Sequence, residues 1–101
     1  MSEPIDLDAI DDVIHGRLRL GVMAYLSGAN VASFPELGEA LDATNGNLST
    51  HLSKLEAADY VRLEKGYNGK RPQTLVHLTP AGREAWIAYL EAMRSVLGTD
   101  S

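Results

Sequence analysis

The sequence predicts a mainly α-helical domain with one small β-hairpin, organised around a helix-turn-helix. Two helical patterns between residues 35 and 58 are separated only by Ala43 and Thr44, a spacing that requires a tight turn between helices. Residues 60–65 and 74–78 alternate apolar and polar side chains, as half-buried strands do. Thr79 and Pro80 follow directly, and this pair is typical of a helix start because Thr caps the first N–H groups and Pro suits the first position.

The composition is that of one globular domain covering residues 1–101. Hydrophobic residues make up 45% and charged residues 23% of the chain, which is ordinary for such a domain. No apolar run approaches the roughly 20 residues that span a bilayer, and the acidic N-terminus lacks the basic and apolar regions of a signal peptide. The absence of cysteine excludes disulfides, thiolate metal sites and a cysteine nucleophile. We therefore expect a cytoplasmic protein with no membrane partner.

Two helices are expected at the N-terminal end, over residues 5–26. In residues 5–14, Leu7, Ile10 and Ile14 have the spacing of one apolar helix face, and aspartates occupy the opposite side. Gly16 interrupts this pattern, and a second helix follows over residues 17–26. Residues 27–30 stop that helix, and residues 31–34 are long enough only for a single extended segment.

The helix-turn-helix of residues 35–58 begins at Pro35, which suits a first helical position. Thr44 is placed to cap the second helix, in which Leu48, Leu52 and Leu55 form an apolar stripe that belongs to the core. The other positions carry short polar groups and one lysine, namely Asn45, Asn47, Ser49, Thr50, His51, Ser53 and Lys54. Such groups are mediocre helix formers, but they can reach phosphates and base edges without extending far from the helix. We interpret this face as a DNA-recognition surface, and an ordinary exposed helix face is the alternative.

A β-hairpin over residues 60–78 is expected to follow. Its two alternating segments are joined by residues 66–72, which are rich in turn formers and include Lys70 and Arg71. We expect a long basic loop here, whose two cations either contact DNA or are simply solvated. The last helix is expected over residues 80–97.

Positive charge is concentrated in the segment that we interpret as the DNA-reading surface. The net charge of the chain is −5, which by itself disfavours a nucleic-acid partner. Residues 1–43 carry two cationic and eight anionic side chains, residues 44–79 carry five and three, and residues 80–101 carry two and three. Only the middle segment has a positive balance, as the attraction of a polyanion requires.

The expected order of helix, helix-turn-helix, hairpin and helix is that of a winged helix. The segments TNGNLSTHLSKLE, YVRLEKGYNGKRPQT and LTPAGREAW together resemble the MarR-like winged helix DNA-binding regulators, and most closely their small single-domain branch. The similarity covers roughly residues 22–90. It implies a winged helix-turn-helix in which the hairpin is the wing.

The resemblance also implies roles for residues of this chain. The DNA-contacting candidates of the recognition helix are Asn45, Asn47, Ser49, Thr50, Ser53 and Lys54, and those of the wing are Lys70 and Arg71. Dimerisation is implied through the terminal helices, where the apolar candidates are Leu7, Ile10, Ile14, Trp86, Tyr89, Met93 and Leu97. The family usually has Gly where this chain has Asp59, at the exit of the recognition helix, because that site favours a left-handed backbone.

The expected function is a homodimeric regulator that binds double-stranded DNA in a sequence-specific manner and represses a promoter. The alternative is a winged helix that binds a protein partner through its acidic N-terminal face, without DNA. A small-molecule effector would bind at the dimer seam, since the sequence offers no dedicated sensor domain.

We expect neither catalysis nor a cofactor. The carboxylates lie at exposed helical positions rather than in pairs beside apolar pockets, and no glycine-rich phosphate loop or nucleophile elbow occurs in the sequence. His15 and His77 are far apart and lack ligand spacing. His77 is expected to pack on its strand, and His51 to contact phosphate or solvent.

Overall fold

The computed structural model describes residues 7–98, which form four α-helices, one short 3-10 helix and a three-stranded antiparallel sheet. The elements in chain order are η1 (Leu7–Ala9), α1 (Arg17–Ala29), β1 (Val31–Ser33), α2 (Phe34–Leu41), α3 (Asn45–Ala57), β2 (Val61–Asn68), β3 (Arg71–Leu78) and α4 (Pro80–Leu97). The mainly helical winged helix-turn-helix predicted from the sequence is confirmed. No helix in this part of the chain is long and apolar enough to cross a membrane.

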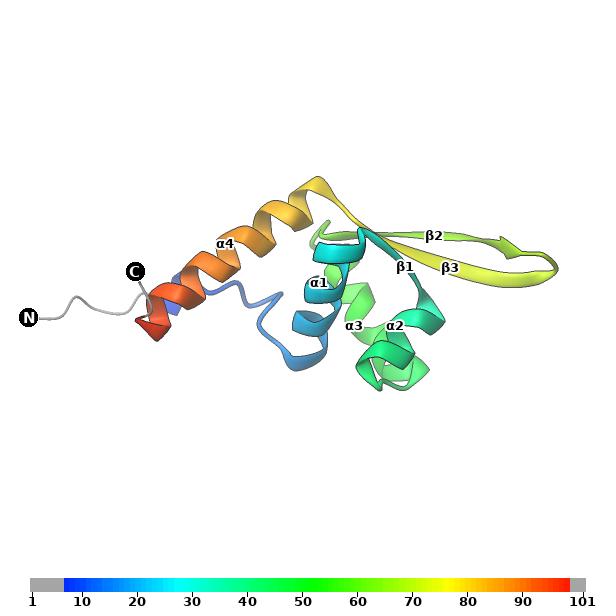
Figure 1. The fold of residues 1–101 in the computed structure, drawn as a ribbon, viewed down its shortest axis with the longest axis horizontal. Helices are drawn as coiled ribbons and strands as arrows, with labels where there is room; N and C mark the ends of the chain where they lie inside the picture. Colours follow the sequence, from blue (N-terminus) through cyan, green and yellow to red (C-terminus); the bar gives the residue numbers. More distant parts are fainter. Residues whose placement is uncertain (1–6, 99–101) are drawn as a thin grey trace, which may run out of the picture.

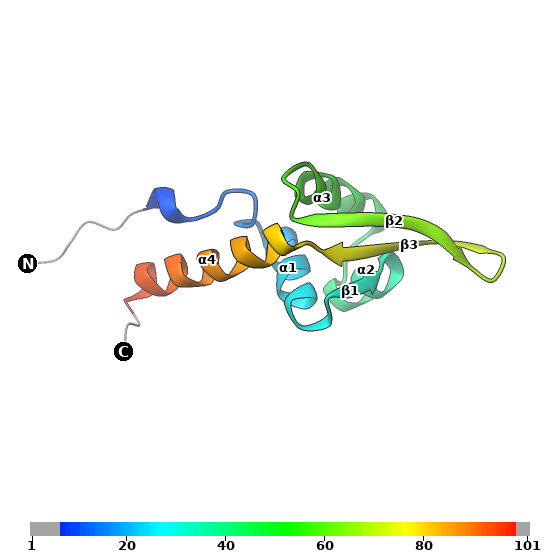
Figure 2. The same cartoon turned by 90° about the horizontal axis from the view of Figure 1, so that it is seen from above.

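The molecule is elongated because two elements leave a central helical bundle in opposite directions. Helices α1, α2 and α3 form the bundle, the β2–β3 hairpin extends from one side, and α4 extends from the other (Figure 1). Seen from above, η1 lies beside α4, at the end of the molecule away from the hairpin (Figure 2). The helix-turn-helix and the hairpin therefore form one end of the molecule, and the terminal elements form the other.

One hydrophobic core holds the bundle, the sheet and much of α4 together. The buried hydrophobic residues come from nearly every element and are Ile14, Val22, Met23, Leu26, Ala32, Leu37, Leu48, Leu52, Leu55, Val61, Val76 and Tyr89. The stripe of leucines on α3 is fully buried, as its spacing predicts, and this fixes which face of α3 remains in solvent.

The helix predicted over residues 5–14 is wrong where the structure describes it, because Leu7–Ala9 is a single 3-10 turn and only turns follow it. The Asp11 carboxylate explains the difference. Its Oδ1 accepts hydrogen bonds from the backbone N–H groups of Val13 (2.8 Å) and Ile14 (3.3 Å), which stabilises a turn instead of a helix. Its Oδ2 accepts a 2.5 Å hydrogen bond from the Tyr60 hydroxyl, which raises the pKa of Tyr60 to about 12. Position 5 lies outside the described residues.

Side-chain caps define the helix-turn-helix. Ser33 begins α2 with a capping box, in which its hydroxyl accepts from the Glu36 N–H (3.1 Å) and its own N–H donates to the Glu36 carboxylate (3.3 Å). This cap starts α2 at Phe34, one residue earlier than the sequence predicts. Thr44 caps α3 as predicted, since its hydroxyl accepts from the Asn47 N–H at 3.2 Å.

The long basic loop predicted over residues 66–72 is wrong, because the strands remain paired up to Asn68 and Arg71. Only Gly69 and Lys70 form the turn, and Gly69 has the positive φ (68°) that a two-residue hairpin loop requires at its first position. Pro72 is tolerated within β3 because β1 pairs only with residues 75–77, which leaves this part of β3 at an edge. The extended segment predicted over residues 31–34 is the third strand of this sheet, in the order β1-β3-β2.

The start of α4 is docked on the exit of α3. The Thr79 hydroxyl donates to the Asp59 carbonyl (2.6 Å) and accepts from the Gly82 N–H (2.8 Å). The Thr79 N–H donates to the Tyr60 carbonyl at 3.1 Å. The predicted cap at Thr79 therefore also ties α4 to the turn that follows the recognition helix.

Asp59 adopts the left-handed conformation that the resemblance to the MarR-like regulators implies for this site, with φ 65°. A left-handed backbone strains a side chain that has a Cβ, and glycine relieves that strain while increasing the entropy of the unfolded chain. We expect Asp59→Gly to raise the free energy of unfolding by about 0.5–1 kcal/mol in urea denaturation, whereas Asp59→Ala lowers it. A glycine variant no more stable than the wild type would contradict this assignment.

Candidate nucleic-acid interface

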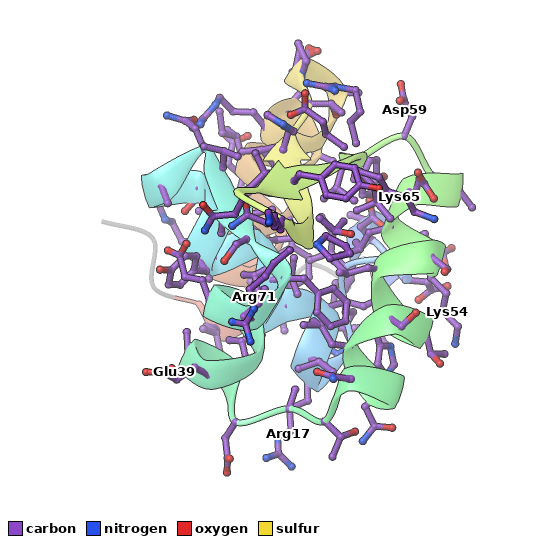
Figure 3. The ribbon with its side chains drawn as sticks, turned by 90° about the vertical axis from the view of Figure 1, so that its right-hand side faces the viewer. Arg17, Glu39, Lys54, Asp59, Lys65 and Arg71 are labelled. Atoms are coloured by element: carbon purple, nitrogen blue, oxygen red, sulfur yellow. The ribbon has the colours of Figure 1, made fainter. Side chains whose placement is uncertain are left out.

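The polar face of α3 is presented to solvent along its whole length. All six residues of the predicted recognition surface are exposed, namely Asn45, Asn47, Ser49, Thr50, Ser53 and Lys54. The Thr50 hydroxyl donates to the Gly46 carbonyl at 3.0 Å, which fixes its orientation on the helix. Figure 3, viewed with the wing toward the reader, shows Lys54 on the outer side of α3.

A hollow separates α3 from the wing on one flank. Ser49 and Ser53 of α3 line it together with Lys65 and Thr74 of the hairpin, and it has a volume of about 540 Å³. The Lys65 cation therefore lies across this hollow from the hydroxyl groups of the recognition helix, and the Glu56 carboxylate of α3 lines the same hollow. Lys65 is not among the site residues predicted from the sequence.

The strand register divides the wing into two faces. Val61, Leu63, Lys65 and Tyr67 alternate along one face of β2, and the first two pack on the core. Lys65 and the 76% exposed ring of Tyr67 therefore share the face that looks toward the helices. Arg71 lies on the opposite face, paired with Asn68, and Lys70 lies in the turn. The alternation in the sequence indicated two faces for residues 60–65, but only the strand pairing shows that these faces continue to the end of the hairpin.

His51 lies on the other flank of α3 and is half-buried, and it has a protein partner in addition to the phosphate or solvent contact expected from the sequence. Its Nδ1 accepts a 2.8 Å hydrogen bond from Arg19, whose Nε donates to the Val13 carbonyl at 2.6 Å. Because a guanidinium only donates, Nδ1 is unprotonated in this arrangement. Burial, followed by the positive charges of Arg19 and Lys54, lowers the pKa of His51 below its usual 6.5.

This environment predicts a loss of stability in mild acid. Between the unfolded and folded pKa values of His51, the unfolded chain binds a proton that the folded chain does not. The free energy of unfolding should therefore fall as the pH drops through 6.5 and below, and His51→Gln should remove that part of the fall. Urea denaturation of both proteins between about pH 7 and pH 5 measures the difference. Parallel pH profiles would rule out this role of His51.

The other two histidines do not form a shared site. His77 Nε2 lies 2.8 Å from the Glu64 carboxylate on the neighbouring strand, so it has a polar partner that strand packing alone did not predict. His15 Nδ1 lies 2.9 Å from the Tyr89 hydroxyl. Within residues 7–98, no group of three or more histidine and carboxylate side chains is placed to hold a metal ion.

The seven predicted dimerisation residues are distributed between the core and the surface. Ile14 and Tyr89 are buried within the protomer, and Trp86 stacks on Tyr89 with ring centroids 5.8 Å apart. Ile10, Trp86 and Met93 are half-buried against the core, whereas Leu7 and Leu97 are 64% and 67% exposed. Two exposed apolar residues of α4, Ile87 and Leu90, were not selected from the sequence. Among the described residues, the large apolar side chains exposed at this end of the molecule are therefore Leu7, Ile87, Leu90 and Leu97.

Known proteins share the winged helix arrangement of this chain. The family model described as winged helix DNA-binding domain matches residues 18–97. An uncharacterized protein of Methanocaldococcus jannaschii is 33% identical over 78 residues, which are 77% of this chain and 85% of the relative. The transcriptional regulator homologue protein from Pyrococcus horikoshii OT3 matches with a TM-score of 0.80 at 32% identity, covering 88% of this chain and 89% of that one. A MarR-family transcriptional regulator from Silicibacter pomeroyi matches with a TM-score of 0.67 at 26% identity, covering 86% of this chain and 57% of that one. The resemblance found in the sequence is confirmed.

Proposed function

The chain belongs to the winged helix DNA-binding domain family, and on this premise we propose that it is a transcription regulator that binds double-stranded DNA as a homodimer and represses its target promoter. The observation that supports this most strongly is the geometry of α3. Its apolar stripe is fully buried, so its short polar side chains stand free at the end of the molecule that also carries the wing.

In this proposal α3 enters the major groove and the wing lies along the adjacent backbone. Asn45, Asn47, Ser49, Thr50 and Ser53 contact base edges and phosphates, which suits the short reach of their side chains. Lys54 contacts a phosphate or guanine, and Lys70 and Arg71 at the hairpin turn contact phosphates.

The homodimer is proposed to form at the opposite end of the molecule. Ile87, Leu90 and Leu97 are exposed on α4, and Leu7 is exposed on the neighbouring η1. A second copy that covers these side chains would leave both α3 helices free, and two-fold symmetry would set the half-sites roughly 34–36 Å apart.

Selection of bound sequences from a random duplex library tests the proposal. The same selection is carried out with the wild type and with the Asn47→Ala variant. The wild type should enrich two related half-sites about one helical turn apart. Asn47→Ala should change the enriched bases while keeping its affinity for random duplex, since an amide that reads a base edge adds little to general binding. A folded wild type that enriches nothing and is not retained on DNA at low salt would select the protein-interaction alternative.

A further inference from the structure

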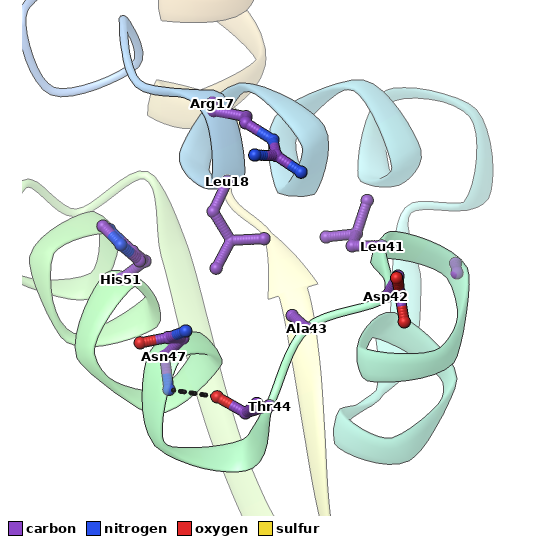
Figure 4. Close-up of a pocket in the computed structure, with 9 residues that line it drawn as sticks. Arg17, Leu18, Leu41, Asp42, Ala43, Thr44, Asn47 and His51 are labelled. Carbon is purple, nitrogen blue, oxygen red and sulfur yellow. Dashed lines mark hydrogen bonds between the residues drawn. The ribbon is translucent and has the colours of Figure 1, made fainter.

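The flank of α3 that faces away from the wing borders a second hollow, with a volume of about 730 Å³ (Figure 4). Three segments meet there: the start of α1, the end of α2 with the turn that follows it, and the first half of α3. Leu18, Leu41 and Ala43 supply its apolar part, and Thr44, Asn47 and His51 its polar part on the α3 side. Arg17, the first residue of α1, is exposed at its rim.

The charges around this hollow are few and opposed. Arg17 is the cation that lines it and Asp42 is the anion. The first turn of α3 also faces this region, and its N–H groups include those that find no carbonyl within the helix. The positive end of the α3 dipole adds to the field of Arg17, whereas the Asp42 carboxylate opposes it.

The width of the major groove indicates which part of DNA would lie beside these groups. A helix with its side chains is about 10–12 Å wide and the major groove is about 12 Å wide. A helix seated in the groove therefore has one phosphate backbone beside each flank. On the wing side, Lys65 lies beside Ser49 and Ser53, and the Glu56 carboxylate lines the same hollow and opposes its charge. On the other side, Arg17 stands beside Thr44 and Asn47.

We propose that Arg17 binds a phosphate of the DNA strand that passes the flank of α3 away from the wing, and that Asp42 weakens this contact. The inference rests on the proposed DNA-binding function and adds a second phosphate contact, on α1, to those of α3 and the wing. The two flanks of α3 are then held by cations from different elements, Arg17 from α1 and Lys65 from β2.

Four variants test the contact by fluorescence anisotropy with a random-sequence duplex over a range of salt concentrations. Arg17→Ala should lower the slope of log affinity against log salt by roughly 0.9, the value for one phosphate, and Arg17→Lys should retain the slope. Asp42→Asn should tighten binding, and asparagine suits the left-handed backbone at this position (φ 52°). Arg62→Ala removes the same charge from the opposite face of the sheet and should leave the slope unchanged.

The results distinguish failure of the proposed Arg17 contact from failure of the proposed DNA-binding function. Wild-type binding with an unchanged slope in Arg17→Ala, or an equal loss in Arg62→Ala, would overturn the role of Arg17 while leaving DNA binding intact. A wild type that fails to bind at low salt would overturn the proposed function itself. On a duplex that carries a site selected from the random library, phosphate ethylation interference gives the position. Arg17→Ala should lose interference at a phosphate on one side of the α3 footprint, and Lys65→Ala on the other.

Discussion

Replacing Gly82 with alanine is expected to lower the free energy of unfolding by more than about 3 kcal/mol. Gly82 is buried in the first turn of α4, and a Cβ at this position would lie 2.1 Å from the carbonyl oxygen of Tyr60 and 2.9 Å from its carbonyl carbon. Backbone atoms cannot rotate away as the end of a long side chain can. The α4 helix would have to separate from the turn after α3, which breaks the hydrogen bonds that Thr79 makes to Asp59 and Tyr60.

Urea denaturation followed by the fluorescence of Trp86, the one tryptophan of the chain, measures this effect. Gly28→Ala is the matched control, because Gly28 lies in α1 and a Cβ there meets nothing within 4 Å. The control should be more stable than the wild type by up to about 1 kcal/mol, as alanine favours a helix. Equal stabilities for Gly82→Ala and the wild type would show that α4 does not dock on the α3 exit as described.

Replacing both Lys70 and Arg71 with alanine should weaken binding to every DNA sequence and lower the salt slope by roughly 1.8, the value for two phosphates. Both side chains are exposed at the end of the hairpin, where they leave the core untouched. Because phosphate contacts carry no base information, the loss should be equal for a selected operator and for random duplex.

Anisotropy titrations at several salt concentrations measure this slope, and the free energy of unfolding of the double variant should match that of the wild type. A single Arg62→Ala variant, which alters the base of the wing, should keep the wild-type slope. An unchanged slope in the double variant would show that the tip of the wing does not contact DNA.

Local sequence patterns were sufficient for the elements whose ends are set by neighbouring residues. Thr44 and Thr79 cap helices within three residues of themselves, and the α3 leucines define a buried stripe by spacing alone. The wrong predictions lie where hydrogen bonds to another segment of the chain, and not the local pattern, decide the structure. Asp11 is fixed in part by Tyr60, which lies 49 positions away in the chain. Residues 66–68 and 71–72 are held in strands by cross-strand pairing, which outweighs local propensity, and only Gly69 and Lys70 turn.

The sequence was sufficient to predict that α3 carries the candidate DNA-binding face, but not which residues of α1 and the hairpin lie beside it. The polar side chains of α3 were identified from composition and spacing, whereas Arg17 and Lys65 become relevant only through the hollows beside α3. Burial within the protomer likewise removes Ile14 and Tyr89 from the surface offered to a partner and adds Ile87 and Leu90. The sequence shows that a helix position is apolar, but not whether its side chain packs in the core of the protomer or lies on the surface offered to a partner.

The most direct test of the proposed function is the affinity of the wild-type chain for random-sequence duplex DNA, measured by fluorescence anisotropy at about 50 and 200 mM salt. Binding by α3 and the wing predicts clear association at the lower concentration and a steep loss at the higher one, since each phosphate contact adds to the salt dependence. A folded protein that shows no association at the lower concentration would contradict DNA binding, and the acidic face would then become the surface to test against a protein partner.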